Sequence, residues 1–173
     1  MTAGSLAGLG LIAVPGARAQ RPAMGGGGIA GGGVAETADG EAWFSLFGSR
    51  LLVGDDDEPI FFGRVQWVDE SLGVTLESTD IVSYGPPKDD PDARELRGSM
   101  SVDGAGSYHF VLRALDVGGP GDGLDTIVLT VGPEAAAGTP AAATPAGDFA
   151  YAVEATVSAG DLQLLSFDEP GQG

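Results

Sequence analysis

Three aspartates in one glycine-rich segment are the side chains best suited to chemistry in this sequence. Asp116, Asp122 and Asp125 lie within ten residues of one another, with glycines between them. Ca²⁺ takes about six to eight oxygen ligands, and glycines let backbone carbonyls turn towards a common centre. The spacing is not that of an EF-hand. We therefore expect these three carboxylates to be candidate ligands of Ca²⁺. The alternative is an acidic turn whose carboxylates are solvated. The acidic run at 55–58 is a weaker calcium candidate and is typical of a solubilising turn.

Aromatic side chains offer a second kind of site. Trp43 and Trp67, with Tyr84 further along the chain, could form a stacking platform for sugar rings. Aromatic residues on β-strands more often belong to the core, because burying their large apolar surface is strongly favourable. We therefore expect these side chains to be core residues.

Catalysis finds little support in the sequence. His109 is the only histidine, and no G-x-S-x-G motif occurs. The residue alternation places His109 on the polar face of a strand, where we expect it to be solvated. Acidic residues are numerous enough to supply a pair for acid–base hydrolysis, but carboxylates clustered in turns are usually solvated. The expectation is a protein without enzymatic activity, and a carboxylate-dependent hydrolase is the alternative.

The charge balance excludes whole classes of partner. Eight basic residues stand against 25 acidic ones, which gives a net charge of -17. Such a surface repels nucleic acid and anionic lipid headgroups. There is no cysteine, and therefore no disulfide, zinc–thiolate site or thiol nucleophile.

The N-terminal residues predict export. An uncharged stretch at 5–14 precedes Ala17-Arg18-Ala19, which fits the cleavage site of a signal peptide over residues 1–19, although no basic residue opens the segment. The alternative is an ordinary apolar tail. After cleavage we expect a secreted chain, not inserted in a membrane, that begins at Gln20 with a glycine-rich flexible linker over 20–40.

A period of two dominates the rest of the chain and predicts a single all-β domain over residues 41–168, with a tail at 169–173. About eight short strands separated by turns favour an antiparallel β-sandwich or small barrel. A disordered Ala/Pro/Thr-rich loop is expected at 133–147, because its spaced prolines forbid a helix. The expected strands are 43–53, 61–68, 72–82, 96–102, 107–114, 124–131, 149–157 and 162–167, with a last hairpin turn at 158–161.

The clearest hairpin signal lies at residues 103–106. Asp103-Gly104 opens a short connection between two alternating runs, and glycine accepts the positive φ that such turns require. At least one of Gly104 and Gly106 should have a positive φ. Tyr108 and Phe110, on the apolar face of the following strand, should be buried.

The segment from Gly98 to Phe110 resembles the G-x-x-x-V/I-N/D-G-x-G-x-Y-x-F signature of the post-COAP domain, a small β-domain of secreted bacterial proteins. Three further segments, at 78–82, 114–127 and 151–164, are similar to other parts of that family in the same order. The resemblance covers about residues 40–167 and departs from the family at the insertion before Tyr151 and at Asp161. It implies a secreted accessory domain and carries over no catalytic residue.

Together these patterns predict a secreted, acidic, non-catalytic accessory or binding module, with calcium as a candidate stabilising ion. Its partner would be an extracellular protein or polymer. A structural subunit of a surface adhesin is a further alternative.

Overall fold

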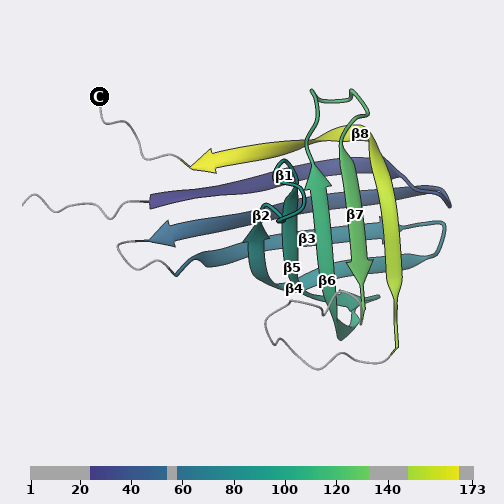
Figure 1. Ribbon diagram of the computed structural model, residues 1–173. Helices are drawn as coiled ribbons and strands as arrows, with labels where there is room; N and C mark the ends of the chain where they lie inside the picture. Colours follow the sequence, from purple (N-terminus) through teal and green to yellow (C-terminus); the bar gives the residue numbers. More distant parts are fainter. Residues whose placement is uncertain (1–23, 54–57, 133–147, 168–173) are drawn as a thin grey trace, which may run out of the picture.

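Eight strands make up the structure, a computed structural model that describes residues 24–53, 58–132 and 148–167 (Figure 1). No helix of this part is long and apolar enough to cross a membrane. The predictions for residues 1–19, 133–147 and 169–173 lie outside the described residues. The strands are β1 (Met24–Glu36), β2 (Glu41–Val53), β3 (Ile60–Asp69), β4 (Val74–Gly85), β5 (Arg94–Val102), β6 (Ala105–Leu115), β7 (Thr126–Val131) and β8 (Tyr151–Phe167).

The strands form a closed antiparallel barrel. Each strand pairs with the next along the chain, and β8 pairs with β1, with Gly26 opposite Phe167 and Glu36 opposite Thr156. The prediction of an all-β fold is confirmed, and the barrel is the correct choice of the two predicted architectures.

The glycine-rich segment predicted as a flexible linker is instead strand β1, paired on both sides along most of its length. The prediction for residues 20–40 was wrong because glycines leave no alternating side-chain pattern to detect. Glycines are needed in β1 because the backbone of the neighbouring strand approaches it closely. A Cβ atom at Gly31 would collide with the carbonyl oxygen of Asp161, and one at Gly33 with that of Ala159. The β-domain therefore begins at β1, well before residue 41.

The predicted hairpin at 158–161 is also corrected, because one continuous strand, β8, runs through it. β8 pairs with β7 up to Thr156 and with β1 beyond it, and Ser158 is an extra residue between the pairs Val157–Ala35 and Ala159–Val34. The Ser158 hydroxyl donates to the Val34 carbonyl over 3.3 Å. Such a bulge bends a strand and turns the corner between two sheets.

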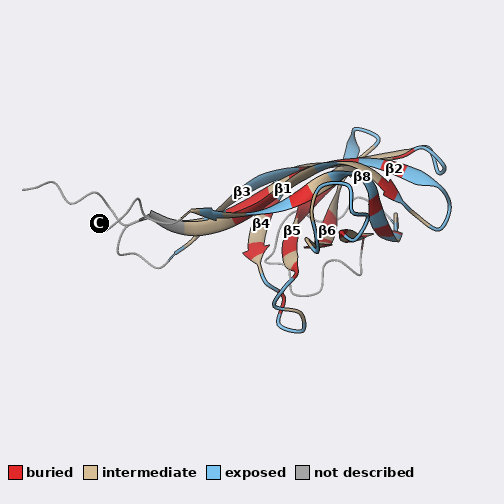
Figure 2. Ribbon diagram, turned by 90° about the horizontal axis from the view of Figure 1, so that it is seen from above, coloured by how far each residue is buried: buried red, intermediate tan, exposed pale blue. Residues whose placement is uncertain are grey.

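Strand β4 turns the opposite corner of the barrel. It pairs with β3 near its start and with β5 further on, and its register shifts between Ser78 and Asp80. In Figure 1, β1–β3 therefore run across the direction of β5–β7. Parts of β8, β1, β2 and β3 project past the barrel as an open four-stranded sheet, the extension, which Figure 2 shows from above. The extension comprises residues 160–167, 26–33, 46–51 and 60–65.

The predicted hairpin between β5 and β6 is confirmed. Asp103, Gly104 and Gly106 have φ angles of 51°, 74° and 71°. Phe110 is fully buried in the barrel, and Tyr108 packs against the core as a partly buried residue. The inward rows of all eight strands fill the barrel, and its largest fully buried side chains include Trp67, Phe110, Ile29, Leu76, Leu96 and Met100.

A chain of buried polar groups closes one end of the barrel. Trp67 Nε1 donates to the Tyr151 hydroxyl over 2.8 Å, and this hydroxyl donates to Asp69 Oδ2. Asp69 Oδ1 accepts from the Ser71 hydroxyl and from the Leu72 N–H. Burial alone would raise the pKa of Asp69, but hydrogen bonds from Ser71, Leu72 and Tyr151 hold it below its ordinary value.

Candidate functional site

The three aspartates proposed for calcium lie in and beside the loop that joins β6 to β7, and each accepts a hydrogen bond from a backbone N–H. Asp125 is buried, with Oδ1 accepting from Val117 at 2.9 Å and Oδ2 from Leu162 at 3.0 Å. Asp116 Oδ2 accepts from Leu164 at 3.1 Å. Asp122 Oδ2 accepts from Gly119 within the same loop at 3.0 Å.

These contacts give the aspartates a role in covering a sheet edge. Beyond Thr156, no described strand pairs with β8 on the side away from β1, so no strand in this part of the structure pairs with the N–H groups of Leu162 and Leu164. Asp125 and Asp116 satisfy them. No group of three His, Cys, Asp or Glu side chains in the described parts of the chain could hold a metal ion. The expected cluster of Asp116, Asp122 and Asp125 is therefore not formed, and residues 55–57 of the second acidic run lie outside the described residues.

The aromatic residues do not form a platform. Trp67 is completely buried and Tyr84 is 7% exposed, so both belong to the core as predicted. Trp43 is 55% exposed on the outer face of β2 and is not a core residue, contrary to the prediction. Its position in the strand alternation places it on the opposite face from Phe44, which is buried.

His109 is buried, with 8% of its surface exposed, which corrects the expectation of a solvated side chain. It lies on β6 opposite Ser99 of β5, and Ser99 is also buried. His109 Nδ1 has no hydrogen-bond partner. A Ser-His-Asp arrangement requires a carboxylate that accepts a hydrogen bond from the imidazole. No described residue forms such a bond with His109 Nδ1.

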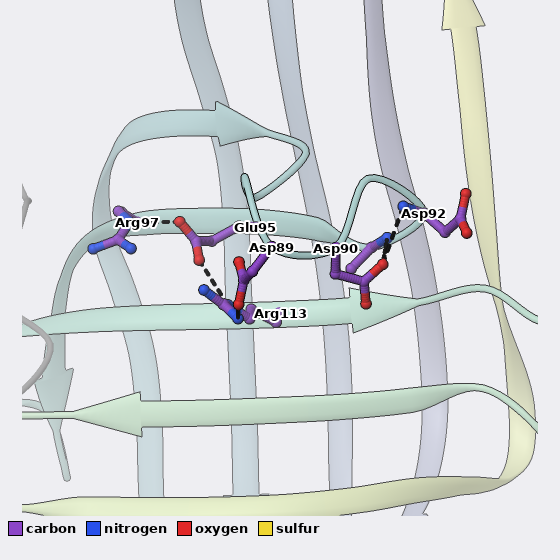
Figure 3. A network of polar contacts seen from close by, with 7 residues as sticks. Asp89, Asp90, Asp92, Glu95, Arg97 and Arg113 are labelled. Carbon is purple, nitrogen blue, oxygen red and sulfur yellow. Dashed lines mark hydrogen bonds and ion pairs between the residues drawn. The ribbon is translucent and has the colours of Figure 1, made fainter.

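An ion-pair network fastens the segment between β4 and β5 to the outer wall of the barrel (Figure 3). Glu95 accepts from Arg97 Nε at 2.6 Å and from Arg113 Nε at 2.8 Å, and Arg113 also reaches Asp89 at 2.8 Å. The hydrogen bond from Arg113 lowers the pKa of Asp89. Both carboxylates are thus held by arginines.

A groove of about 340 Å³ lies where the extension faces the end of β4 and the start of β5. Arg50 of β2 and Arg94 of β5 line it, together with Tyr84 of β4 and with Leu164 and Ser166 of β8. Arg50 occupies the inward row of β2, continuing the alternation of Phe44, Leu46 and Gly48 past the packed core.

The groove is cationic in a strongly acidic chain. The side chain of Arg50 makes no ion pair or hydrogen bond with any residue that the structure describes. Arg94 Nη1 donates to the carbonyls of Pro91 and Ala93 at 3.0 and 2.7 Å, which holds its guanidinium in place without neutralising it. Burial raises the pKa of Tyr84, and Arg94 only partly opposes the rise, so the phenol stays neutral and can donate. Two guanidinium groups beside a phenol can hold a carboxylate or a phosphate.

No family model, no curated protein and no solved structure matches the chain. The functional reading therefore rests on the residues of the groove.

Arg50 and Arg94 were not among the site residues predicted from the sequence. A usable signal was present at Arg50, because the strand alternation puts this charged residue in an inward row. No local pattern marks Arg94, whose place in the groove depends on how β4 and β5 meet the extension.

Proposed function

We propose that this chain is a secreted, non-catalytic binding module that holds an anionic group of an extracellular polymer or protein in the groove lined by Arg50 and Arg94. The observation that carries the proposal is Arg50, an exposed guanidinium without a described acidic partner in a chain of 25 acidic residues. Because no described carboxylate pairs with the Arg50 guanidinium, its charge is available for a ligand.

Further features support binding over turnover. The residues that line the groove include no carboxylate and no histidine, so a general base is missing from the described lining. Leu52 and Leu164 give it apolar walls, as is usual in ligand sites that fix orientation through a few polar groups. The resemblance to secreted post-COAP domains points the same way.

Calorimetric titration tests the proposal, with inorganic phosphate and an oligomer of a uronic acid as probes. Arg50→Gln should weaken binding by about 10- to 100-fold, because hydrogen bonds between charged groups contribute about 1.5 to 3 kcal/mol. Arg64→Gln is the matched control, since Arg64 is exposed elsewhere on the extension and pairs with Glu77 at 3.5 Å. Equal affinities of wild type and Arg50→Gln, or release of a product from the oligomer, would overturn the proposal.

The secretion part has its own test. Protein exported by the native host should begin at Gln20, four residues before β1, so that cleavage leaves the barrel intact. Mass spectrometry of the mature chain measures this. Protein that retains residues 1–19 and stays in the cytosol would contradict it.

A further inference from the structure

The two edge strands of the extension, β8 and β3, differ in whether their outer backbone groups have hydrogen-bond partners. On the β8 edge, the carboxylates of Asp116 and Asp125 accept from the backbone N–H groups of Leu164 and Leu162. The opposite edge is β3, which pairs with β4 only from Gln66 to Asp69. Residues 60–64, the free edge of β3, have β2 on one side and no described strand on the other. Figure 1 shows this part of β3 continuing to the left after β4 has turned away.

The direction of one N–H group shows which backbone groups are open. The N–H of Val65 donates to the Ser78 hydroxyl over 2.8 Å, so it points towards the β4 side. Backbone groups of alternate residues point to the same side of a strand. The N–H and C=O groups of Phe61 and Gly63 therefore also point to this side, where no described residue pairs with them.

Apolar side chains stand beside these open groups. Ile60 is 54% exposed and Phe62 is 41% exposed on the outer face of the extension. The Phe62 ring lies 5.7 Å from that of Phe47 on β2, which gives an incoming side chain an aromatic surface. An edge with unpaired backbone groups and exposed apolar side chains is a template for another strand.

The charge around the free edge of β3 determines which charge a partner segment should carry. Glu58, two residues before the uncovered stretch, is exposed, and so is Asp80, two residues beyond Ser78 on β4. The cation on this part of β3 is Arg64, and Glu77 pairs with it at 3.5 Å. A second copy of the chain would bring another net charge of -17 to the same place, which opposes self-pairing.

We propose that the free edge of β3 binds an extended, cationic segment of a partner protein as an added strand. Main-chain hydrogen bonds to Phe61 and Gly63 hold the segment, as in other cases of strand addition. Apolar side chains on one face of the segment cover Ile60 and Phe62, and lysines or arginines face the surrounding carboxylates. This site is separate from the groove and binds the opposite charge.

The probe is a fluorescent ten-residue peptide of alternating lysine and valine with blocked ends. Fluorescence anisotropy should show saturable binding to the wild type. The same peptide with methylated backbone nitrogens keeps its charge but cannot donate to the carbonyls of the edge, and we expect at least a tenfold loss of affinity. Equal binding of the two peptides would show that the interaction is general charge attraction, and it would overturn the proposal.

Variants locate the site on the protein. Phe62→Lys should weaken binding at least tenfold, and Ile60→Lys provides a second variant, with circular dichroism confirming that each is folded. Val128→Lys is the matched control, because Val128 is a 39% exposed valine on the outer face of β7, away from the edge. Arg50→Gln should bind the peptide like the wild type, so failure of the groove proposal leaves this one standing.

Two further outcomes count against the proposal. If folded Phe62→Lys and Ile60→Lys bind as the wild type does, the edge is not the site. If ultracentrifugation shows a dimer that Phe62→Lys dissociates, a second copy occupies the edge in place of a cationic partner.

Discussion

The hydroxyl of Tyr151 lies 2.9 Å from Oδ2 of Asp69, and this hydrogen bond joins the first residue of β8 to the last residue of β3. The two strands are separated in the sheet by β1 and β2, so the contact crosses the barrel interior. Burial raises the pKa of Tyr151, and the bond to Asp69 raises it further, so the phenol remains a donor. The contact holds one end of the barrel closed.

Replacing Tyr151 with phenylalanine should lower the free energy of unfolding by about 1 to 3 kcal/mol. The change leaves the indole N–H of Trp67 without its acceptor and removes one donor from Asp69, both in buried positions. Urea denaturation measures the difference. Tyr108→Phe is the control, since its hydroxyl makes no hydrogen bond with a described residue, and it should change stability much less. Equal losses from the two substitutions would show that the chain of buried polar groups contributes little.

Asp69 should also make stability depend on pH below about 4. Its pKa in the folded chain is lower than the ordinary 3.8, so the folded state favours the ionised carboxylate. The stabilisation is complete above the unfolded-state pKa and is lost as the pH falls through the lower, folded-state value. Thermal melts between pH 2 and about 6 should show a steeper decline for the wild type than for Asp69→Asn. Parallel curves would contradict the prediction.

Asp125→Ala should destabilise the chain to the same extent in calcium and in chelator. The substitution leaves two N–H groups without an acceptor, and each unsatisfied buried group costs about 1 to 3 kcal/mol. Asp122→Ala should cost less, because its carboxylate serves an exposed N–H within the loop. Melts at constant ionic strength measure both. A calcium-dependent rise in wild-type melting temperature that Asp125→Ala removes would restore the metal hypothesis.

Gly160→Ala should be one of the most damaging glycine substitutions. Gly160 has a φ of 98°, and an added Cβ would collide with the carbonyl oxygen of Gly32 on β1. Left-handed strain and overpacking together predict a loss of about 2 to 4 kcal/mol. Gly104→Ala shares the positive φ but meets nothing within 4 Å, so it should lose only about 1 to 2 kcal/mol. Unfolding curves that rank the two variants the other way would show that the β1–β8 contact tolerates a side chain.

Local alternation was enough to predict most of the strands and the β5–β6 hairpin. The runs around Leu96 and Phe110 place apolar residues on one face, and the turn at Gly104 has the chemistry that the hairpin needs. In these segments the pattern of side chains and the paired strands agree, because burial on one face selects a period of two.

Other features depend on contacts that no local pattern contains. β1 consists largely of glycines, whose use is to let β2 and β8 approach, and this use is visible only when both neighbours are in place. Ser158 sits in a run that is typical of a turn, yet it is the extra residue of a bulge, because Val157 pairs with Ala35 and Ala159 with Val34. The carboxylates of Asp116 and Asp125 are close in sequence, but their partners at Leu164 and Leu162 are set by the path of β8.

The pairing of Gly26 with Phe167 also bears on how the chain folds. The hairpins from β2 to β7 join neighbours in sequence and can form locally, whereas the β1–β8 ladder joins opposite ends of the described chain. Contacts of such high sequence separation bear the largest loop-closure entropy and slow folding. Because the glycines of β1 contribute few side chains to an early apolar cluster, this ladder should form late, and the barrel stays open along one seam until it does.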